Sequence, residues 1–125
     1  MSVKVIHFVS GLGNGGQGIL VKEWLRNKSE DITMDVATVS SGLTEEELKT
    51  EKCTVYHIAP VRECGMRAYL RNAEAIFRQD HYDVVHSHVG VLSWLIFLAA
   101  KKSKTKVCFL HAHGTKYNTD GGSLK

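Results

Sequence analysis

A strand pattern, a glycine-rich loop and a helix pattern follow one another directly near the start of the chain. Residues 3–9 are almost all apolar and rich in Val, Ile and Phe, which is typical of a strand buried on both faces of a parallel sheet. Residues 10–16 contain four glycines, and an amphipathic helix is predicted over residues 15–28. This succession is the opening unit of a doubly wound α/β domain.

The same alternation continues along the chain. Further strands are predicted at residues 35–39, 54–58, 83–86 and 106–110, and further helices after Thr44 and over residues 65–79 and 89–102. In the helix over residues 65–79 we expect one apolar face made of Met66, Tyr69, Leu70, Ala73, Ile76 and Phe77. Strands that alternate with helices need right-handed crossovers, so we predict a Rossmann-like parallel sheet with helices on both faces.

Composition narrows the class of protein. The 125 residues suit one domain, and a net charge of +3 is far from the footprint of a DNA-binding domain. Three cysteines without CxxC spacing argue against a disulfide framework or a zinc ribbon, and favour reduced thiols in the cytoplasm. The start lacks the features of a signal peptide. The apolar run at residues 89–100 is shorter than the roughly 20 residues that span a bilayer, and it predicts a buried helix.

The glycine-rich loop can approach a ligand closely because its glycines have no Cβ, and the helix that follows directs its N–H groups and its positive dipole end at the loop. Gly11, Gly13 and Gly16 satisfy the spacing G-x-G-x-x-G. The predicted second strand, however, ends in Thr-Val-Ser-Ser, without the acid that binds a ribose in NAD enzymes. No G-K-[ST] follows either, which excludes a P-loop. An alternative is that the loop only makes a tight turn.

Histidines follow two of the predicted strands. His86 and His88 come at the end of one strand, and His111 and His113 come after the next, where the ligand crevice of an open α/β sheet lies. Two His-x-His pairs could supply four nitrogens to a metal, but no carboxylate accompanies them, and we predict no metal. We expect His86 and His111 to be partly buried and structural, and His88 and His113 to contact substrate.

Three stretches together resemble the N-terminal domain of family 4 glycosyltransferases, which have the two-domain GT-B fold. They are the strand and Gly-x-Gly-Gly type loop of residues 5–16, the Tyr-Asp-Val-Val-His-Ser-His run of residues 82–88, and the His-Gly step at His113. The resemblance covers nearly the whole chain and is closest to enzymes of capsular or exopolysaccharide biosynthesis. The chain departs from it at Gly18, where the family often has an acid.

The resemblance implies that residues 1–125 form one acceptor-side domain of a truncated chain. No counterpart of the C-terminal donor domain, with its Glu-x7-Glu type motif, is present in the sequence. The complete protein would move a sugar, as a hexosyltransferase, from a nucleotide sugar to a saccharide or lipid-linked acceptor, and the isolated chain would be inactive. Two alternatives stay open: a non-catalytic binding subunit of a split glycosyltransferase, and a nucleotide-binding oxidoreductase or epimerase domain.

The same resemblance implies roles for individual residues. His113 would orient the transferred sugar and is the candidate catalytic residue, while the weaker candidate His88 lies on the acceptor side. The remaining candidate substrate-binding residues are Gly13, Asn14, Gly15, Gly16, Gly114 and Thr115. The glycine loop would line the cleft between the domains.

The resemblance also implies the partners of the chain. They are the nucleotide sugar, the acceptor, and the missing domain or a partner subunit, with no cofactor and no bound metal. The mild net charge argues against nucleic acid as a partner. The cysteines predict a cytoplasmic protein, and the resemblance adds peripheral contact at the inner face of the membrane.

Overall fold

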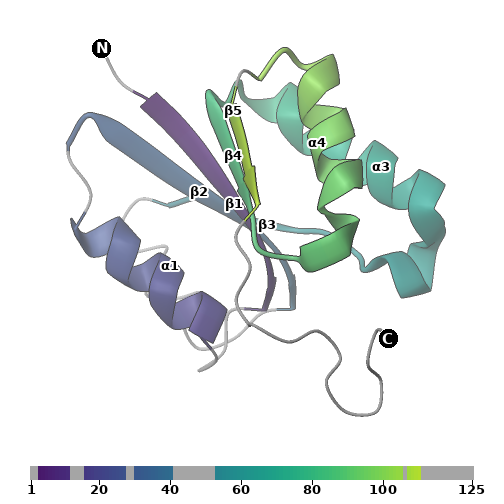
Figure 1. Cartoon of the computed structure of the whole chain (residues 1–125), viewed down its shortest axis with the longest axis horizontal. Helices are drawn as coiled ribbons and strands as arrows, with labels where there is room; N and C mark the ends of the chain where they lie inside the picture. Colours follow the sequence, from purple (N-terminus) through teal and green to yellow (C-terminus); the bar gives the residue numbers. More distant parts are fainter. Residues whose placement is uncertain (1–2, 12–15, 28–29, 41–52, 106, 111–125) are drawn as a thin grey trace.

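The computed structural model describes residues 3–11, 16–27, 30–40, 53–105 and 107–110 (Figure 1). Its elements, in chain order, are β1 (Val3–Gly11), α1 (Gly16–Asn27), β2 (Ile32–Ser40), β3 (Val55–His57), α3 (Val61–Gln79), β4 (Val84–Ser87), the 3₁₀ turn η1 (Gly90–Leu92), α4 (Ser93–Lys102) and β5 (Val107–Leu110). The predicted strand–loop–helix opening is confirmed, since β1 is followed after a short connection by α1.

The five strands form one sheet in the order β3-β2-β1-β4-β5, and every neighbouring pair is parallel. This order confirms the predicted Rossmann-like sheet. The chain winds outward from β1 to β3, then returns to place β4 on the other side of β1. The switch point of the topology therefore lies between β1 and β4, where open α/β sheets bind ligands beyond the carboxyl ends of the strands.

Helices cover both faces of the sheet, as predicted (Figure 1). Helices α3 and α4 pack on one face, over a core that includes Phe8 of β1, Val85 of β4 and Phe77 of α3. Helix α1 packs on the other face, where Val21 and Leu25 meet β1 and β2. Strands with apolar side chains on both faces need this double cover, which explains the near-continuous apolar pattern of the central strands.

Helix α3 differs from its prediction at its start. It begins at Val61 rather than at residue 65, and Gly65 interrupts it with a φ of 88° and a ψ of 162°. This conformation is essentially restricted to glycine, so the helix changes direction there. Met66 follows the kink and is 49% exposed, so its predicted place on the apolar face was wrong. The short helix predicted after Thr44 falls outside the described residues.

Three buried groups have raised pKa values. Burial raises the pKa of the Cys53 thiol from 9.0 to about 12 and the pKa of the Tyr69 phenol from 10.0 to about 12. Burial, helped by a hydrogen bond to Asp35, also raises the pKa of Tyr82 far above its ordinary value. All three groups are therefore neutral in the folded protein at neutral pH.

Alkaline pH is expected to destabilise the fold. Above pH 9 the unfolded chain releases the Cys53 proton, and above pH 10 the tyrosine protons, while the folded protein still holds them. The unfolded state then binds fewer protons, so stability is fully present below about pH 9 and falls as the pH rises toward 12, by up to about 1.4 kcal/mol per pH unit and group. Urea unfolding at pH 8, 9, 10 and 11 measures this slope. Cys53→Ala should make it shallower, and a stability that stays constant to pH 11 would contradict the burial of these groups.

Candidate functional site

A pocket of about 500 Å³ opens at the carboxyl ends of the strands, at the topological switch point. Its walls come from the end of β1, the end of β2, the first turns of α3 and the segment after β4. The lining residues are Ser10, Val39, Pro60, Val61, Arg62, Tyr69, His88, Val89, Gly90 and Leu92. Segments far apart in the sequence thus meet at one concave surface, which is the arrangement of a ligand site in this class of fold.

Hydrogen bonds fix the wall that follows β4. The backbone N–H of His88 donates to the carbonyl oxygen of Phe8 at 2.8 Å, which continues the β1–β4 pairing beyond the last residue of β4. The hydroxyls of Ser87 and Ser93 lie 2.5 Å apart and are buried, and they join this segment to α4. Gly90 then turns the chain with a φ of 73°, a conformation that glycine adopts without strain. These contacts hold the wall in place.

The pocket offers one cation and one phenol among mainly apolar side chains. Arg62 stands at the start of α3 and is exposed, so its guanidinium can reach an anionic group of a ligand. The phenol of Tyr69, whose pKa is about 12, stays neutral and can donate or accept a hydrogen bond. Such a pocket suits a polar ligand that carries a negative charge.

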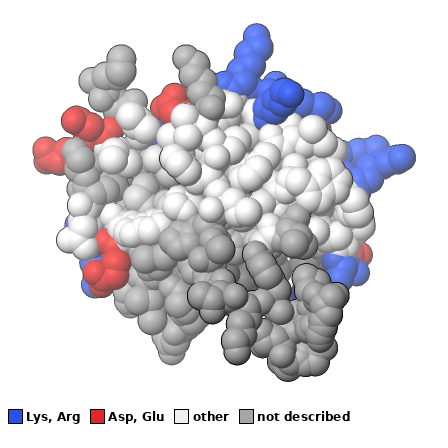
Figure 2. All heavy atoms as spheres, in the orientation of Figure 1, with Lys and Arg blue, Asp and Glu red and all other residues white. Residues whose placement is uncertain are grey.

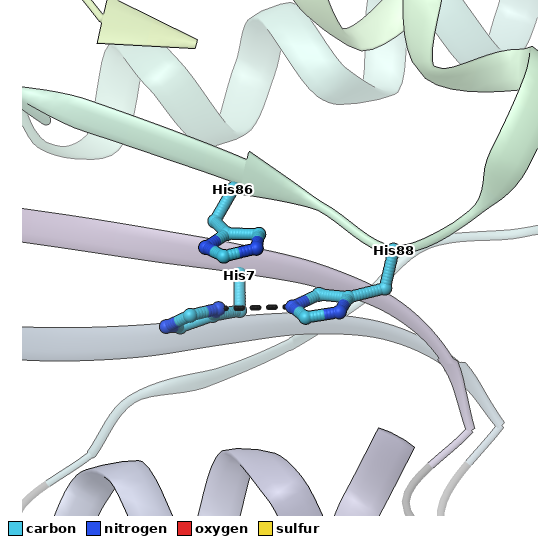
Figure 3. Close-up of side chains that lie close together, drawn as sticks. All are labelled: His7, His86 and His88. Carbon is cyan, nitrogen blue, oxygen red and sulfur yellow. Dashed lines mark hydrogen bonds between the residues drawn. The ribbon is translucent and has the colours of Figure 1, made fainter. Parts of the chain in front are cut away.

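Three histidines form a cluster beside this pocket, on the face of the sheet that α1 covers (Figure 3). His7 and His86 are register partners on β1 and β4, and His88 is two residues further along. His7 is 2% exposed and His88 is 3% exposed. The Nδ1 atom of His7 lies 3.1 Å from the Nε2 atom of His88, and the ring of His86 stacks parallel to that of His88 with centroids 4.5 Å apart. We call these residues the histidine cluster.

Aromatic side chains surround the histidine cluster. The ring of Trp24, from α1, lies 5.1–5.8 Å from the three imidazoles, centroid to centroid. Phe109 of β5 lies 5.9 Å from His86. The cluster is thus held between strands and covered by rings, which limits the orientations open to each imidazole.

Most of the site residues predicted from the sequence fall outside the described residues: Gly13, Asn14, Gly15, His111, His113, Gly114 and Thr115. Gly16 begins α1, and His88 lines the pocket. The side chain of His88 does not point out to solvent. It is 3% exposed, and its ring contacts that of His7. His86 is half-buried beside it, as expected.

Two features of the site were not predicted. Arg62 reaches the pocket because α3 starts there, which the sequence placed four residues later. His7 was read only as part of an apolar strand. Val5, His7 and Val9 lie two residues apart, so their side chains share one face of β1. Which residues of a neighbouring strand lie beside them depends on the order of the strands in the sheet.

A membrane-spanning helix is not among the described elements, none of which combines the necessary length with the necessary apolar character.

Comparison with known proteins gives no match to a protein-family model. In sequence, the chain is 23% identical over 120 residues to EpsF of Bacillus subtilis (strain 168), a protein assigned by its name to the glycosyltransferases. The match covers 93% of this chain and 31% of EpsF. The chain therefore spans about a third of the length of this relative.

Solved structures share the fold. A glycosyltransferase from Rickettsia africae ESF-5 matches with a TM-score of 0.71 at 17% identity, over 92% of this chain and 31% of the other. MurG of Acinetobacter baumannii matches with a TM-score of 0.60 at 16% identity, over 86% and 35%. The C-terminal domain of the PF1911 hydrogenase from Pyrococcus furiosus also matches, with a TM-score of 0.60 at 14% identity, over 87% and 91%. The architecture thus occurs outside glycosyltransferases too, and these likenesses establish the fold alone.

The sequence similarity to EpsF and the fold shared with two glycosyltransferases point the same way as the resemblance noted in the sequence. The chain is a Rossmann-like α/β domain, and its similarities support a glycosyltransferase domain.

Proposed function

We propose that the chain is the acceptor-side half of a GT-B glycosyltransferase of family 4, acting in capsular or exopolysaccharide biosynthesis. The observation that carries the proposal is the pocket at the switch point between β1 and β4, which lies in a chain similar to EpsF over 93% of its length. Its substrates would be a nucleotide sugar and a saccharide or lipid-linked acceptor.

The pocket would bind and orient the acceptor. Arg62 would hold a phosphate of a lipid-linked acceptor, and Tyr69 would hydrogen-bond a sugar hydroxyl. Fixing the acceptor in one pose lowers the entropic cost of the transfer step. Within this proposal the loop residues Gly13, Asn14, Gly15 and Gly16 line the cleft toward the donor. His113, Gly114 and Thr115 contact the transferred sugar.

The donor half would supply the remaining chemistry. In the proposed mechanism the bond between the sugar and the nucleoside diphosphate breaks, and the diphosphate departs as the leaving group. Cationic groups and helix N-termini would stabilise the negative charge that develops on it. A second domain, on the same chain or on a partner subunit, would provide them. The transfer step would need neither a bound metal nor a cofactor.

A peripheral membrane contact in the cytoplasm is part of the proposal. Trp94 and Leu98 lie one turn apart on α4 and are 52% and 41% exposed, and the exposed Lys101 and Lys102 end the same helix. Figure 2 shows an uncharged area bordered by Lys and Arg side chains on this face. An apolar strip beside cations suits an anionic membrane surface, where a lipid-linked acceptor would lie.

An oxidoreductase or epimerase function is disfavoured by the end of β2. Its last residues, Thr38, Val39 and Ser40, include no carboxylate at the place where NAD enzymes bind the ribose. A fluorescence titration with NADH tests this alternative, and saturable binding would favour it.

The chain of residues 1–125 is expected to transfer no sugar when it is given a panel of nucleotide sugars and acceptors, because it spans only about a third of the length of EpsF. Turnover by the chain alone, measured as release of nucleoside diphosphate, would contradict the proposal. Turnover that appears only after a separately expressed donor domain is added would support it, and would identify a split enzyme.

Arg62→Ala is expected to weaken binding of a phosphate-bearing acceptor by about tenfold, the loss of one charge-assisted hydrogen bond. A saccharide 1-diphosphate with a short lipid tail is a suitable probe for isothermal titration calorimetry. Arg71→Ala is the matched control, because Arg71 is an exposed arginine of the same helix that does not line the pocket. If both variants weaken binding equally, the acceptor does not bind in this pocket.

A further inference from the structure

The histidine cluster brings together three imidazoles from two strands on one face of the sheet. His7 and His86 are side by side because β1 and β4 pair in register, and His88 reaches the same face because it is two residues beyond His86. One ring nitrogen from each residue lies within 4.8 Å of the other two. Among the described residues, these three alone gather in this way.

The spacing of the nitrogens is close to that of a metal site. A zinc ion binds imidazole nitrogen at about 2.0–2.1 Å, which in tetrahedral geometry places neighbouring ligand nitrogens roughly 3.3 Å apart. His7 Nδ1 and His88 Nε2 are already 3.1 Å apart. The third nitrogen has to move by about an ångström and a half from the outer limit of 4.8 Å to complete the set.

His86 is the residue that has to turn. An imidazole donates its lone pair in the plane of its ring, and the rings of His86 and His88 are stacked in parallel, so their lone pairs do not meet in this arrangement (Figure 3). His86 is half-buried, whereas His7 and His88 are fully buried, so His86 is the one of the three whose side chain reaches solvent. Rotation of His86 brings in the third nitrogen. The proton held between His7 and His88 has to move to the other nitrogen of its ring or to solvent, because each ligand nitrogen must offer its lone pair to the ion.

The donor set defines the class of ion. Imidazole suits zinc, copper and nickel, whereas magnesium and calcium prefer oxygen ligands. Three protein nitrogens leave a fourth position for water or an anion. Trp24 lies against all three imidazoles, and its apolar ring limits exchange with solvent around such an ion.

We propose that His7, His86 and His88 form a binding site for a divalent first-row transition-metal ion, with zinc as the best-fitting ion. The ion would join the middle of β1 to β4 and to the segment after β4, and it would fix His88, which also lines the pocket. The site is structural or regulatory, and the proposed transfer step does not require the ion.

Calorimetry with Zn²⁺ and absorption spectroscopy with Co²⁺ on the full chain test the site. We expect one ion per chain, visible d–d absorption with Co²⁺, and a shift of the ring ¹⁵N resonances of all three histidines on addition of Zn²⁺. His86→Ala is expected to weaken Zn²⁺ binding at least about tenfold, since even changes beyond the ligands themselves cost that much. His88→Asn provides a second variant, and circular dichroism checks that both fold.

His57→Ala and His81→Ala are the matched controls, because both residues are exposed histidines outside the cluster. Their Zn²⁺ affinity is expected to equal that of the unchanged chain. Zn²⁺ that fails to bind, or that binds His86→Ala and His88→Asn unchanged, overturns the proposal and leaves the 3.1 Å contact as a simple hydrogen bond. Binding that is lost instead in a His111→Ala/His113→Ala double variant overturns it as well.

Discussion

Replacement of Phe8 by alanine is expected to lower the free energy of unfolding by about 3–5 kcal/mol, the usual cost of removing a buried phenylalanine. Phe8 lies in the central strand β1 and is 1% exposed. Its ring stacks on Phe77 of α3 at a centroid distance of 5.9 Å. The truncation would open a cavity between the sheet and α3. Because β1 is hydrogen-bonded to both β2 and β4, it cannot move to fill that cavity. Urea unfolding of the chain, followed by circular dichroism, measures the loss.

Phe109→Ala removes the same atoms from β5 and serves as the control. Phe109 is 53% exposed, so its truncation should cost less than about 1 kcal/mol. A loss of equal size in both variants would mean that the core does not lie between the sheet and α3. Since a domain of this size has about 5–15 kcal/mol of stability, the Phe8 variant is also expected to unfold at a clearly lower temperature.

The succession of elements was predictable because each has a strong local signal. The central strands are apolar on both faces, the helices show a 3.6-residue period, and the glycine-rich stretch separates the first strand from the first helix. The start of α3 was not predictable in this way. A glycine inside an apolar period gives no sign of its φ, and Gly65 at 88° changes the phase of the helix so that Met66 turns outward.

The site was predictable only in part, because it depends on which strands become neighbours. His88 drew attention through its place after a strand and through the resemblance to glycosyltransferases. His7 precedes it by 81 residues, and only the pairing of β1 with β4 brings the two rings together. The sequence offered His111 and His113 as partners for His86 and His88 instead. The available signal for His7 was a histidine between Val5 and Val9 in a largely apolar strand, on a face that the pattern predicts to be buried.

His88 links the two proposals, since it lines the pocket and belongs to the histidine cluster. Their tests remain separate because they change different residues. Arg62→Ala should affect the anionic ligand and leave Zn²⁺ binding unchanged, whereas His86→Ala should do the reverse. An effect of bound Zn²⁺ on ligand affinity would then show that the cluster controls the pocket wall, with a coupling that is equal in both directions.

Tyr82→Phe is expected to lower the free energy of unfolding by about 1.5–3 kcal/mol, the range for a buried hydrogen bond to a charged group. The Tyr82 hydroxyl donates to Oδ2 of Asp35, and both residues are buried, at 1% and 8% exposure. The other oxygen, Oδ1, accepts from the backbone N–H of Thr54 at 3.0 Å. Without the hydroxyl, the buried carboxylate of Asp35 accepts one hydrogen bond fewer. The loss of stability comes mainly from burying a carboxylate whose hydrogen bonds are incomplete. Urea unfolding at pH 7 measures it.

A double-mutant cycle with Asp35→Asn separates this pair from its surroundings. The hydroxyl stabilises a carboxylate more than a neutral amide, so Tyr82→Phe should cost less in the Asp35→Asn background, with a coupling of about 1–2 kcal/mol. Tyr69→Phe removes a hydroxyl at the pocket wall and should cost less than about 1 kcal/mol, which makes it the matched control. Coupling near zero would mean that the buried carboxylate of β2 does not depend on Tyr82. The contact that joins β2 to the start of β4 would then contribute to specificity of packing rather than to stability.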